Sequence, residues 1–224
     1  MVDSDSVGQA LAISRPAHND RACDEMTKMT LQAKLFLMKS ELSPTKFRIA
    51  KSIAMLVQKL PVDSIENIIM EQKLITRFVE PALAPLFEDT TNNILFRWTS
   101  TMNDEYQTTS IIAITQDRHD ACTSTLNGTF WGTSCGFGEV KCFSQAENKF
   151  LVWKDLIRLG YFSKNAIDVH KMNGVLAFQV MGRHVFFYLT KLMHDGLYLM
   201  LQVDKIKLPV GIKLGQGRKD GMEK

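Results

Sequence analysis

The chain has 224 residues, of which 45% are hydrophobic and 23% charged, with 27 lysines and arginines against 24 aspartates and glutamates. These proportions are ordinary for a folded globular protein, and they exclude collagen-like, coiled-coil and wholly disordered classes. The net charge of +3 does not by itself indicate a nucleic-acid-binding protein, so any basic surface has to come from a local concentration of charge. At this length we expect one core, with or without an appendage.

Two features of the sequence bear on where the protein resides. The longest apolar runs are broken by Lys, Arg or Asp and stay short of the ~20 residues of a membrane-spanning helix. The first six residues are acidic and lack the basic-then-apolar layout of a signal peptide, and the four cysteines contain no CxxC pair. We therefore expect a nuclear or cytoplasmic protein with reduced thiols, which is not secreted and binds no membrane.

The N-terminal part of the chain has the pattern of helices. Residues 1–24 are small, polar and without periodicity, which predicts a disordered tail. Apolar spacing predicts a helical extension over 25–62, with one helix at about 24–39 and a second at about 46–60. A third helix is predicted to begin at Asp63 and Ser64, which are good N-cap residues, and to continue with a kink at Pro81 as far as Phe87.

The rest of the chain contains most of the β-prone segments. The predicted strands are rich in β-branched and aromatic residues, and they span Ile94–Trp98, Ile111–Ile114 with Ala121–Leu126 as one interrupted strand, Gly132–Phe143, Val175–Met181, Val185–Leu192 and Leu197–Val203. One helix is predicted from about Gln145 to Leu159, and the basic residues from Lys205 onward are expected to fray. This order of helices, three strands, one helix and a β-meander indicates the α/β class with an N-terminal helical extension.

The most informative segment combines a carboxylate with a later Glu-x-Lys sequence. Asp120 ends the run Gln116-Asp-Arg-His-Asp120, and Glu139 follows it by nineteen positions within Gly138-Glu-Val-Lys141. Side chains two residues apart on a strand point to the same face, so Glu139 and Lys141 project together. Such a pair is either a cross-strand ion pair of small energetic value or, together with Asp120, a site for a hard divalent cation.

The motif and the order of elements resemble the PD-(D/E)XK, or restriction-endonuclease-like, nuclease superfamily, whose core is an αβββαβ arrangement. Five stretches are also similar to a group of fungal proteins that carry this core, namely Phe78–Phe87, Leu95–Trp98, Gly136–Lys141, Asp155–Arg158 and Ile206–Pro209. The resemblance covers residues 63–209, which we therefore expect to form the nuclease-like core. Residues 210–224 are then expected to be a basic flexible tail.

The resemblance implies a site residue by residue. The first acidic position of the motif falls on Asp120, its Glu on Glu139 and its Lys on Lys141, which would make these three the catalytic residues. Asp120 and Glu139 would hold Mg²⁺ or Mn²⁺. In many members of the superfamily a Glu on the first core helix joins the metal site, and Glu71 is the best-placed match for it.

Some positions leave this assignment open. Glu66 and Glu80 compete for the role of the helix carboxylate. The residue before Asp120 is His119, where the superfamily usually has proline, and this difference does not exclude catalysis. Asp117 is an alternative for the first acidic ligand.

A basic segment follows the motif. Residues 141–171 contain six basic and three acidic side chains, an excess equal to that of the whole chain. Lys154 and Arg158 are four residues apart on the predicted helix, so they are expected to share a face and to contact a phosphate backbone. The alternative is an ordinary solvated helix face with Asp155 as partner. Gln145 follows the motif by four residues, as in some related nucleases, and is a further candidate for nucleic-acid binding.

The function expected from these residues is metal-dependent hydrolysis of nucleic-acid phosphodiesters, most simply those of DNA. The main alternative is a nuclease-fold module that no longer cuts and serves in nucleic-acid binding or protein interaction. A third interpretation is that the motif is fortuitous and that the chain is an interaction domain. Many members of the superfamily dimerise, so a homodimer is among the expected assemblies.

Overall fold

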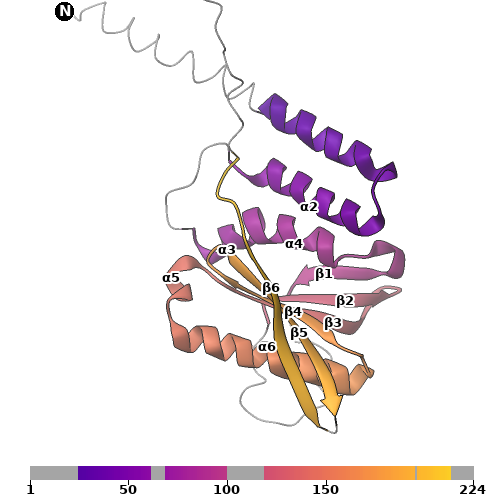
Figure 1. Ribbon diagram of the computed structural model, residues 1–224, viewed down its shortest axis with the longest axis vertical. Helices are drawn as coiled ribbons and strands as arrows, with labels where there is room; N and C mark the ends of the chain where they lie inside the picture. The colour runs from indigo at the N-terminus through magenta and orange to yellow at the C-terminus, as the bar shows by residue number, and fades with distance from the viewer. Residues whose placement is uncertain (1–24, 62–68, 100–118, 195, 213–224) are drawn as a thin grey trace, which may run out of the picture. The chain divides into compact units, whose positions relative to one another are not determined.

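The computed structural model describes residues 25–61, 69–99, 119–194 and 196–212 of the chain (Figure 1). These residues fall into two compact units, one within Met1–Ile65 and Val210–Lys224 and the other within Glu66–Pro209. No helix of the described ranges is long and apolar enough to cross a membrane. Several predicted features lie outside the description, namely the tail 1–24, the N-cap residues 63 and 64, the segment Ile111–Ile114, the candidates Glu66 and Asp117, and the end of the basic tail, 213–224.

The described residues of the first unit form two helices. A helix over 25–37 is followed by a 3-10 turn (Met38–Ser40), and α2 spans Pro44–Lys59. Pro44 lies in the first turn of α2, where a backbone N–H is not needed, and the helix ends before Pro61. The buried apolar residues of α2, Ala50, Ala54 and Val57, are four and three positions apart and form one stripe, and Ser52 is also buried. Both helices predicted for the extension are confirmed, with ends shifted by one or two residues.

The second unit is a mixed α/β structure built on a six-stranded sheet. Its strands are β1 (Ile94–Trp98), β2 (Ala121–Asn127), β3 (Phe130–Lys141), β4 (Val175–Met181), β5 (His184–His194) and β6 (Leu197–Lys207). The strands lie in chain order, and all neighbours are antiparallel except β3 and β4. A parallel pair needs a crossover, and here the crossover contains the long helix α6 (Lys149–His170).

Two of the predicted strands agree with the structure in both bounds. β1 and β4 have the predicted bounds, and Gly182 has the positive φ of 58° expected in the turn between β4 and β5. The prediction that the chain frays from Lys205 onward is wrong for residues 205–208. Lys205 and Lys207 pair with β5, and the next residue, Leu208, is buried and donates its backbone N–H to the Arg183 carbonyl.

The third predicted helix is irregular over its described residues. Ile69 and Met70 precede it, and the helix starts as α3 (Glu71–Leu74), where Glu71 supplies the acidic residue favoured in a first turn. A π-helical turn (Ile75–Val79) then leads into α4 (Glu80–Phe87). Proline has no N–H and its ring crowds the carbonyl four residues before it, so the wider turn ahead of Pro81 takes the place of the predicted kink.

The helix predicted to end at Leu159 continues to His170 as α6. Its N-terminus is preceded by a short helix, α5 (Phe143–Ala146), and is capped by Asn148, whose side-chain oxygen accepts hydrogen bonds from the next turn. Gly160 lies inside α6 and does not end it, because tertiary packing outweighs the ~1 kcal/mol helical penalty of one glycine.

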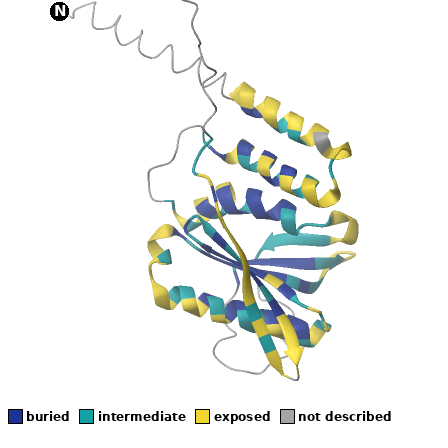
Figure 2. Ribbon diagram, viewed as in Figure 1, coloured by how far each residue is buried: buried dark blue, intermediate teal, exposed yellow. Residues whose placement is uncertain are grey.

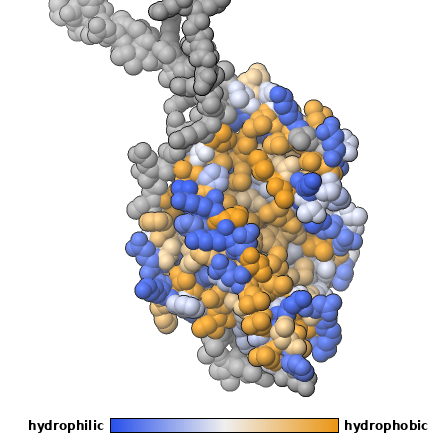
Figure 3. Space-filling view, viewed as in Figure 1, coloured by the Kyte–Doolittle hydropathy of each residue, from blue (hydrophilic) through white to orange (hydrophobic). Residues whose placement is uncertain are grey.

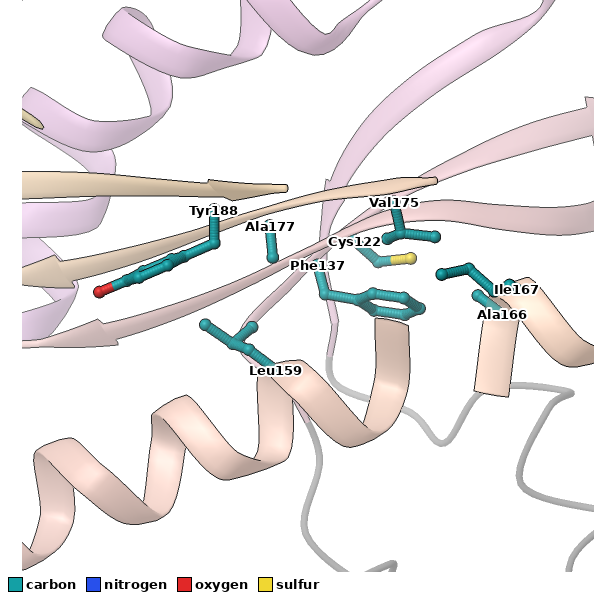
Figure 4. Packing of buried hydrophobic residues seen from close by; sticks show 8 residues of the cluster. All are labelled: Cys122, Phe137, Leu159, Ala166, Ile167, Val175, Ala177 and Tyr188. Carbon is teal, nitrogen blue, oxygen red and sulfur yellow. The ribbon is translucent and has the colours of Figure 1, made fainter. Parts of the chain in front are cut away.

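The sheet lies between α4 and α6, and buried residues concentrate in the sheet and on the sides of these helices that face it (Figures 1 and 2). On the α6 side, Phe137 and Cys122 pack with Leu159 and Ile167 (Figure 4). On the α4 side an aromatic cluster is formed by Phe87, Phe96, Phe178 and Phe187, with ring centroids 5.5–6.4 Å apart. Alternate residues of β3 therefore belong to two different cores.

Among the described strands, β1 and β6 form the edges of the sheet. β6 exposes apolar side chains at alternate positions, including Leu197, Leu199 and Leu201, and hydrophobic atoms lie at the surface over this strand in Figure 3. Nothing in the described structure shows what covers this edge, and the expected homodimer stays a prediction.

Candidate active site

Asp120 and Glu139 lie side by side where β2 begins and β3 ends. Ala121 pairs with Gly138, so Asp120, one residue earlier, adjoins Glu139. The backbone N–H of Asp120 donates to the Gly138 carbonyl over 3.0 Å. Its carboxylate accepts a 2.7 Å hydrogen bond from the backbone N–H of Val140. These two bonds fix the Asp120 side chain against the end of β3.

Helix α6 supplies the other half of the site. The Glu139 carboxylate is fully buried, and its Oε1 lies 3.3 Å from Nη2 of Arg158. Arg158 Nη1 lies 3.2 Å from Oδ1 of Asp155, whose Oδ2 lies 3.0 Å from Nζ of Lys141. The result is a chain of alternating charges in the order Glu139, Arg158, Asp155 and Lys141. Glu139 and Lys141 thus share the α6 face of β3.

Glu71, at the start of α3, belongs to the same electrostatic environment. Partial burial raises the pKa of its carboxyl, and the Asp120 carboxylate raises it further, whereas Lys141 opposes the shift. Such coupling requires these groups to be near one another. Glu80, its competitor within the described residues, begins α4. We refer below to the charged cluster, which consists of Glu71, Asp120, Glu139, Lys141, Asp155 and Arg158.

The charged cluster has more carboxylates than cations. Burial raises the pKa of Glu139 well above its ordinary value, and the neighbouring Asp120 adds to the shift against the opposing effect of Arg158. Burial also raises the pKa of Asp120, although the hydrogen bond from Val140 and the charge of Lys141 counteract it. Four carboxylates face two cations, which leaves an excess of two negative charges when all are ionised.

Lys141 keeps its proton in this environment. Burial alone would lower the pKa of its ammonium group, but the hydrogen bond to Asp155 and the carboxylates of Asp120 and Glu139 outweigh burial and raise the pKa. The side chain is 15% exposed, against 0% for Glu139. Lys141 therefore presents a positive charge at the more accessible end of the cluster.

The carboxylates of the cluster are not arranged as a ready metal cage. Among the described residues, no three His, Cys, Asp or Glu side chains converge closely enough to hold a metal ion. The reason lies in the ion pairs, because Glu139 contacts Arg158, and Asp155 contacts both Arg158 and Lys141. The donor atoms are nevertheless hard carboxylate oxygens, the type that Mg²⁺ and Mn²⁺ prefer.

His119, which stands where the superfamily usually has proline, is a core residue. It is 2% exposed, and its ring packs against those of Phe137 and Phe162, with both centroid distances 5.2 Å. Thr99 donates from its hydroxyl to the His119 carbonyl and from its backbone N–H to the Asp120 carbonyl. The histidine thus anchors the segment that carries Asp120.

Acid is expected to destabilise the fold through His119. Burial, and then the charges of Arg158 and Arg97, lower the pKa of this imidazole to about 3. The unfolded chain binds the proton at about pH 6.5 and the folded protein does not, so stability falls as the pH drops from 6.5 toward 3. This group contributes a loss of about 2 kcal/mol between pH 7 and pH 5 in the metal-free protein.

Urea unfolding of wild type and His119→Phe at the two pH values measures this contribution. The phenyl ring suits the aromatic surroundings and has no proton to gain, so the variant should lack that part of the pH dependence. His194→Asn, at an exposed position, serves as the control. The same pH dependence in wild type and His119→Phe would show that His119 does not titrate as a buried neutral group.

Lys154 and Arg158, predicted to share a helix face and to contact a phosphate backbone, differ in their surroundings. Lys154 is exposed, whereas Arg158 is 7% exposed and bound to Glu139 and Asp155. Residues four apart on an α-helix differ in direction by about 40°, enough to separate the two at the boundary of a buried face. Gln145 is exposed on α5, and its predicted role and that of Lys154 stay predictions.

Asp155 is the site residue that the sequence prediction missed. The sequence pattern indicates Asp155 only as a partner of the cations on a solvated helix face. In the structure Asp155 is 3% exposed and joins Arg158 to Lys141. The signal that would have found it is the spacing of Asp155 and Arg158, one turn apart and next to the core residue Leu159. A helix that buries two opposite charges on its apolar side needs partners for them.

No protein-family model, curated protein or solved structure matches the chain. The resemblance to the nuclease superfamily therefore depends on the motif residues and the order of the elements. The function has to be inferred from the chemistry of the charged cluster itself.

Proposed function

We propose that this chain is a metal-dependent nuclease that hydrolyses phosphodiester bonds of nucleic acid, most simply DNA. The observation that carries the proposal is the juxtaposition of Asp120, Glu139 and Lys141 at adjoining ends of β2 and β3. Glu71 joins them from a separate helix. These are the residues that the motif of the superfamily would assign to catalysis and metal binding.

The order of elements supports the same assignment. The helical segment ending in α4 is followed by the antiparallel strands β1, β2 and β3, by α6, and by β4 parallel to β3. This order agrees with an αβββαβ core. The ends of β2 and β3 that carry Asp120 and Glu139 correspond to the position at which such a core would hold its site.

The donor set and the charge of the cluster suit one divalent cation. Asp120 and Glu139 would hold Mg²⁺ or Mn²⁺, with Glu71 as a further carboxylate. When bound, the ion would supply positive charge to the phosphate and lower the pKa of a bound water molecule. The excess of two negative charges in the cluster equals the charge of one such ion.

The remaining roles in the proposed reaction belong to side chains of the protein. Lys141 is protonated at neutral pH, so we assign it the stabilisation of negative charge on the phosphate and not the role of general base. Glu139 and Arg158 are buried, whereas Glu71 and Lys141 are partly exposed, so the substrate approaches from the side of these two residues. Lys154 and Gln145, both exposed beyond the motif, are candidates for contacts with the nucleic-acid backbone.

The proposal is tested by cleavage of supercoiled plasmid and linear DNA with purified protein. We expect nicking with Mg²⁺ or Mn²⁺ that EDTA stops. Glu139→Gln and Asp120→Asn should lose cleavage through loss of the metal, and Lys141→Met should lose about 10²–10³-fold in rate through loss of a preorganised charge. Lys164→Met is the matched control, because Lys164 is an exposed cation on α6 that pairs with Asp168 outside the charged cluster. Cleavage at the wild-type rate in Glu139→Gln would rule out the site.

One observation favours the second candidate function, a nuclease-fold module without cleavage. The Glu139 carboxylate already contacts Arg158, and the described carboxylates do not converge on one position. This candidate predicts no cleavage by the wild-type protein with any divalent metal. It also predicts that DNA binding, if present, weakens steeply with salt and depends on Lys154.

A further inference from the structure

We propose that Arg158 is a displaceable counter-ion, which neutralises Glu139 in the metal-free protein and gives up that carboxylate when a divalent cation binds. The inference rests on the proposed function, because it concerns the same site. It assigns to α6 a role in controlling when the metal can bind.

The contact between Arg158 and Glu139 is long for so buried a pair. Nη2 lies 3.3 Å from Oε1 and Nη1 lies 3.4 Å from Oε2, whereas charge-assisted hydrogen bonds are usually about 2.7–2.9 Å. Oε1 has no hydrogen-bond partner among the described residues. By contrast, the exposed pair of Lys164 and Asp168 on the same helix has a distance of 2.7 Å. Charge holds Arg158 at Glu139, but hydrogen-bond geometry does little to fix it there.

Arg158 also has a second anchor that would remain after displacement. Its Nη1 lies 3.2 Å from Asp155, and its guanidinium carbon lies 6.0 Å from the centroid of the Phe162 ring. A buried cation without any partner would be costly. Because Asp155 continues to pair with it, Arg158 can release Glu139 and stay within the protein.

The balance of charge gives the displacement its driving force. With both cations in place and all four carboxyls ionised, the cluster has an excess of two negative charges. A divalent ion at Asp120 and Glu139 removes this excess but repels the guanidinium at the same carboxylate. Binding of the metal and contact of Arg158 with Glu139 are therefore competing states, and the apparent metal affinity is reduced by the fraction of protein in the paired state.

Calorimetric titration of the full chain with Mn²⁺ tests the competition. We expect Arg158→Met to bind Mn²⁺ at least about tenfold more tightly than the wild type, since the competing cation is gone. Lys141→Met is the matched control, because it removes the same charge from the same cluster but contacts Asp155 and not Glu139. General electrostatics would tighten binding equally in both variants, whereas competition at Glu139 requires a larger gain in Arg158→Met.

A second measurement uses the wild-type protein and needs only the conservative variant Arg158→Lys, which keeps the positive charge, to assign one signal. In ¹⁵N-labelled protein, the side-chain N–H signal of Arg158 is identified by its absence in Arg158→Lys. Titration with Mg²⁺ should shift this signal in step with metal binding, because the guanidinium changes partners. If Arg158→Met fails to fold, this titration decides the question.

The outcomes separate this inference from the proposed function. Mn²⁺ binding to Arg158→Met no tighter than to Lys141→Met, or an Arg158 signal that stays unchanged at saturating Mg²⁺, overturns the counter-ion role while leaving the nuclease proposal intact. Binding only after Arg158 is replaced supports the role in its strongest form. If neither the wild type nor Arg158→Met binds Mn²⁺, both proposals are wrong.

Discussion

Asp155→Asn is expected to lower the free energy of unfolding by about 3–5 kcal/mol, whereas Asp168→Asn should lower it by less than about 1 kcal/mol. Both aspartates lie on α6 and pair with a cation on the same helix. Asp155 is 3% exposed and holds Lys141 as well as Arg158, so its loss leaves buried positive charge without compensation. Asp168 accepts hydrogen bonds from Lys164 and Tyr198, but its side chain is 40% exposed, so the asparagine oxygen and water replace the lost contact.

Urea unfolding followed by circular dichroism, in EDTA to remove divalent ions, measures both values. The two variants make the same chemical change on one helix, so the difference between them reports the burial of the ion pair. Similar small losses in both would show that solvent reaches Asp155 and that the charged cluster is not a buried network.

Gly138→Ala is expected to cost about 3 kcal/mol, the upper part of the range for overpacked cores. Gly138 pairs with Phe178 across β3 and β4, and the ring of Phe178 folds over it. A Cβ at Gly138 would lie 2.1 Å from Cζ of that ring. Phe178 is 2% exposed and packs against Phe87 and Phe96, so the ring has no room to move aside.

Chemical denaturation of two further variants distinguishes this clash from a general cost of alanine. In Gly160→Ala the new Cβ on α6 lies 3.7 Å from the sulfur of Met200 on β6, which is an ordinary van der Waals contact. Because alanine favours the helix more than glycine does, stability should rise by about 0.5–1 kcal/mol. The double variant Gly138→Ala with Phe178→Leu should lose less than the sum of its single changes, because the smaller side chain relieves the clash. Additive losses would contradict the proposed contact.

Local patterns in the sequence were enough to predict most of the sheet. β1 and β4 combine β-branched and aromatic residues within clear boundaries, and their bounds agree with the prediction. The alternation of β3 also placed Glu139 and Lys141 on one face, because side-chain direction along a strand follows from backbone geometry alone. Helix ends were less predictable, since Gly160 resembles a stop signal and only its packing in α6 shows that it is not.

The sequence pattern does not predict which residues of α6 join the charged cluster. Nothing local distinguishes Arg158, which is buried, from Lys154, which is exposed one turn earlier. The direction of each depends on how α6 rotates against the sheet, and that rotation is set by contacts of Leu159 and Ile167 with residues far away in the chain. The identity of the residues facing Glu139 is therefore a tertiary property.

The order of the strands has a consequence for how the protein folds. Three of the five neighbouring pairs, β2–β3, β4–β5 and β5–β6, are hairpins closed by short turns, so they form from contacts between residues close in the chain. β3 can pair with β4 only after the connection that contains α6 has closed into a loop. The entropic cost of closing so long a connection makes the β3–β4 pairing a late step. Glu139 reaches Arg158 only when α6 packs against the sheet. The hairpins can therefore form while the carboxylates are still in water, and the charges are buried when α6 docks.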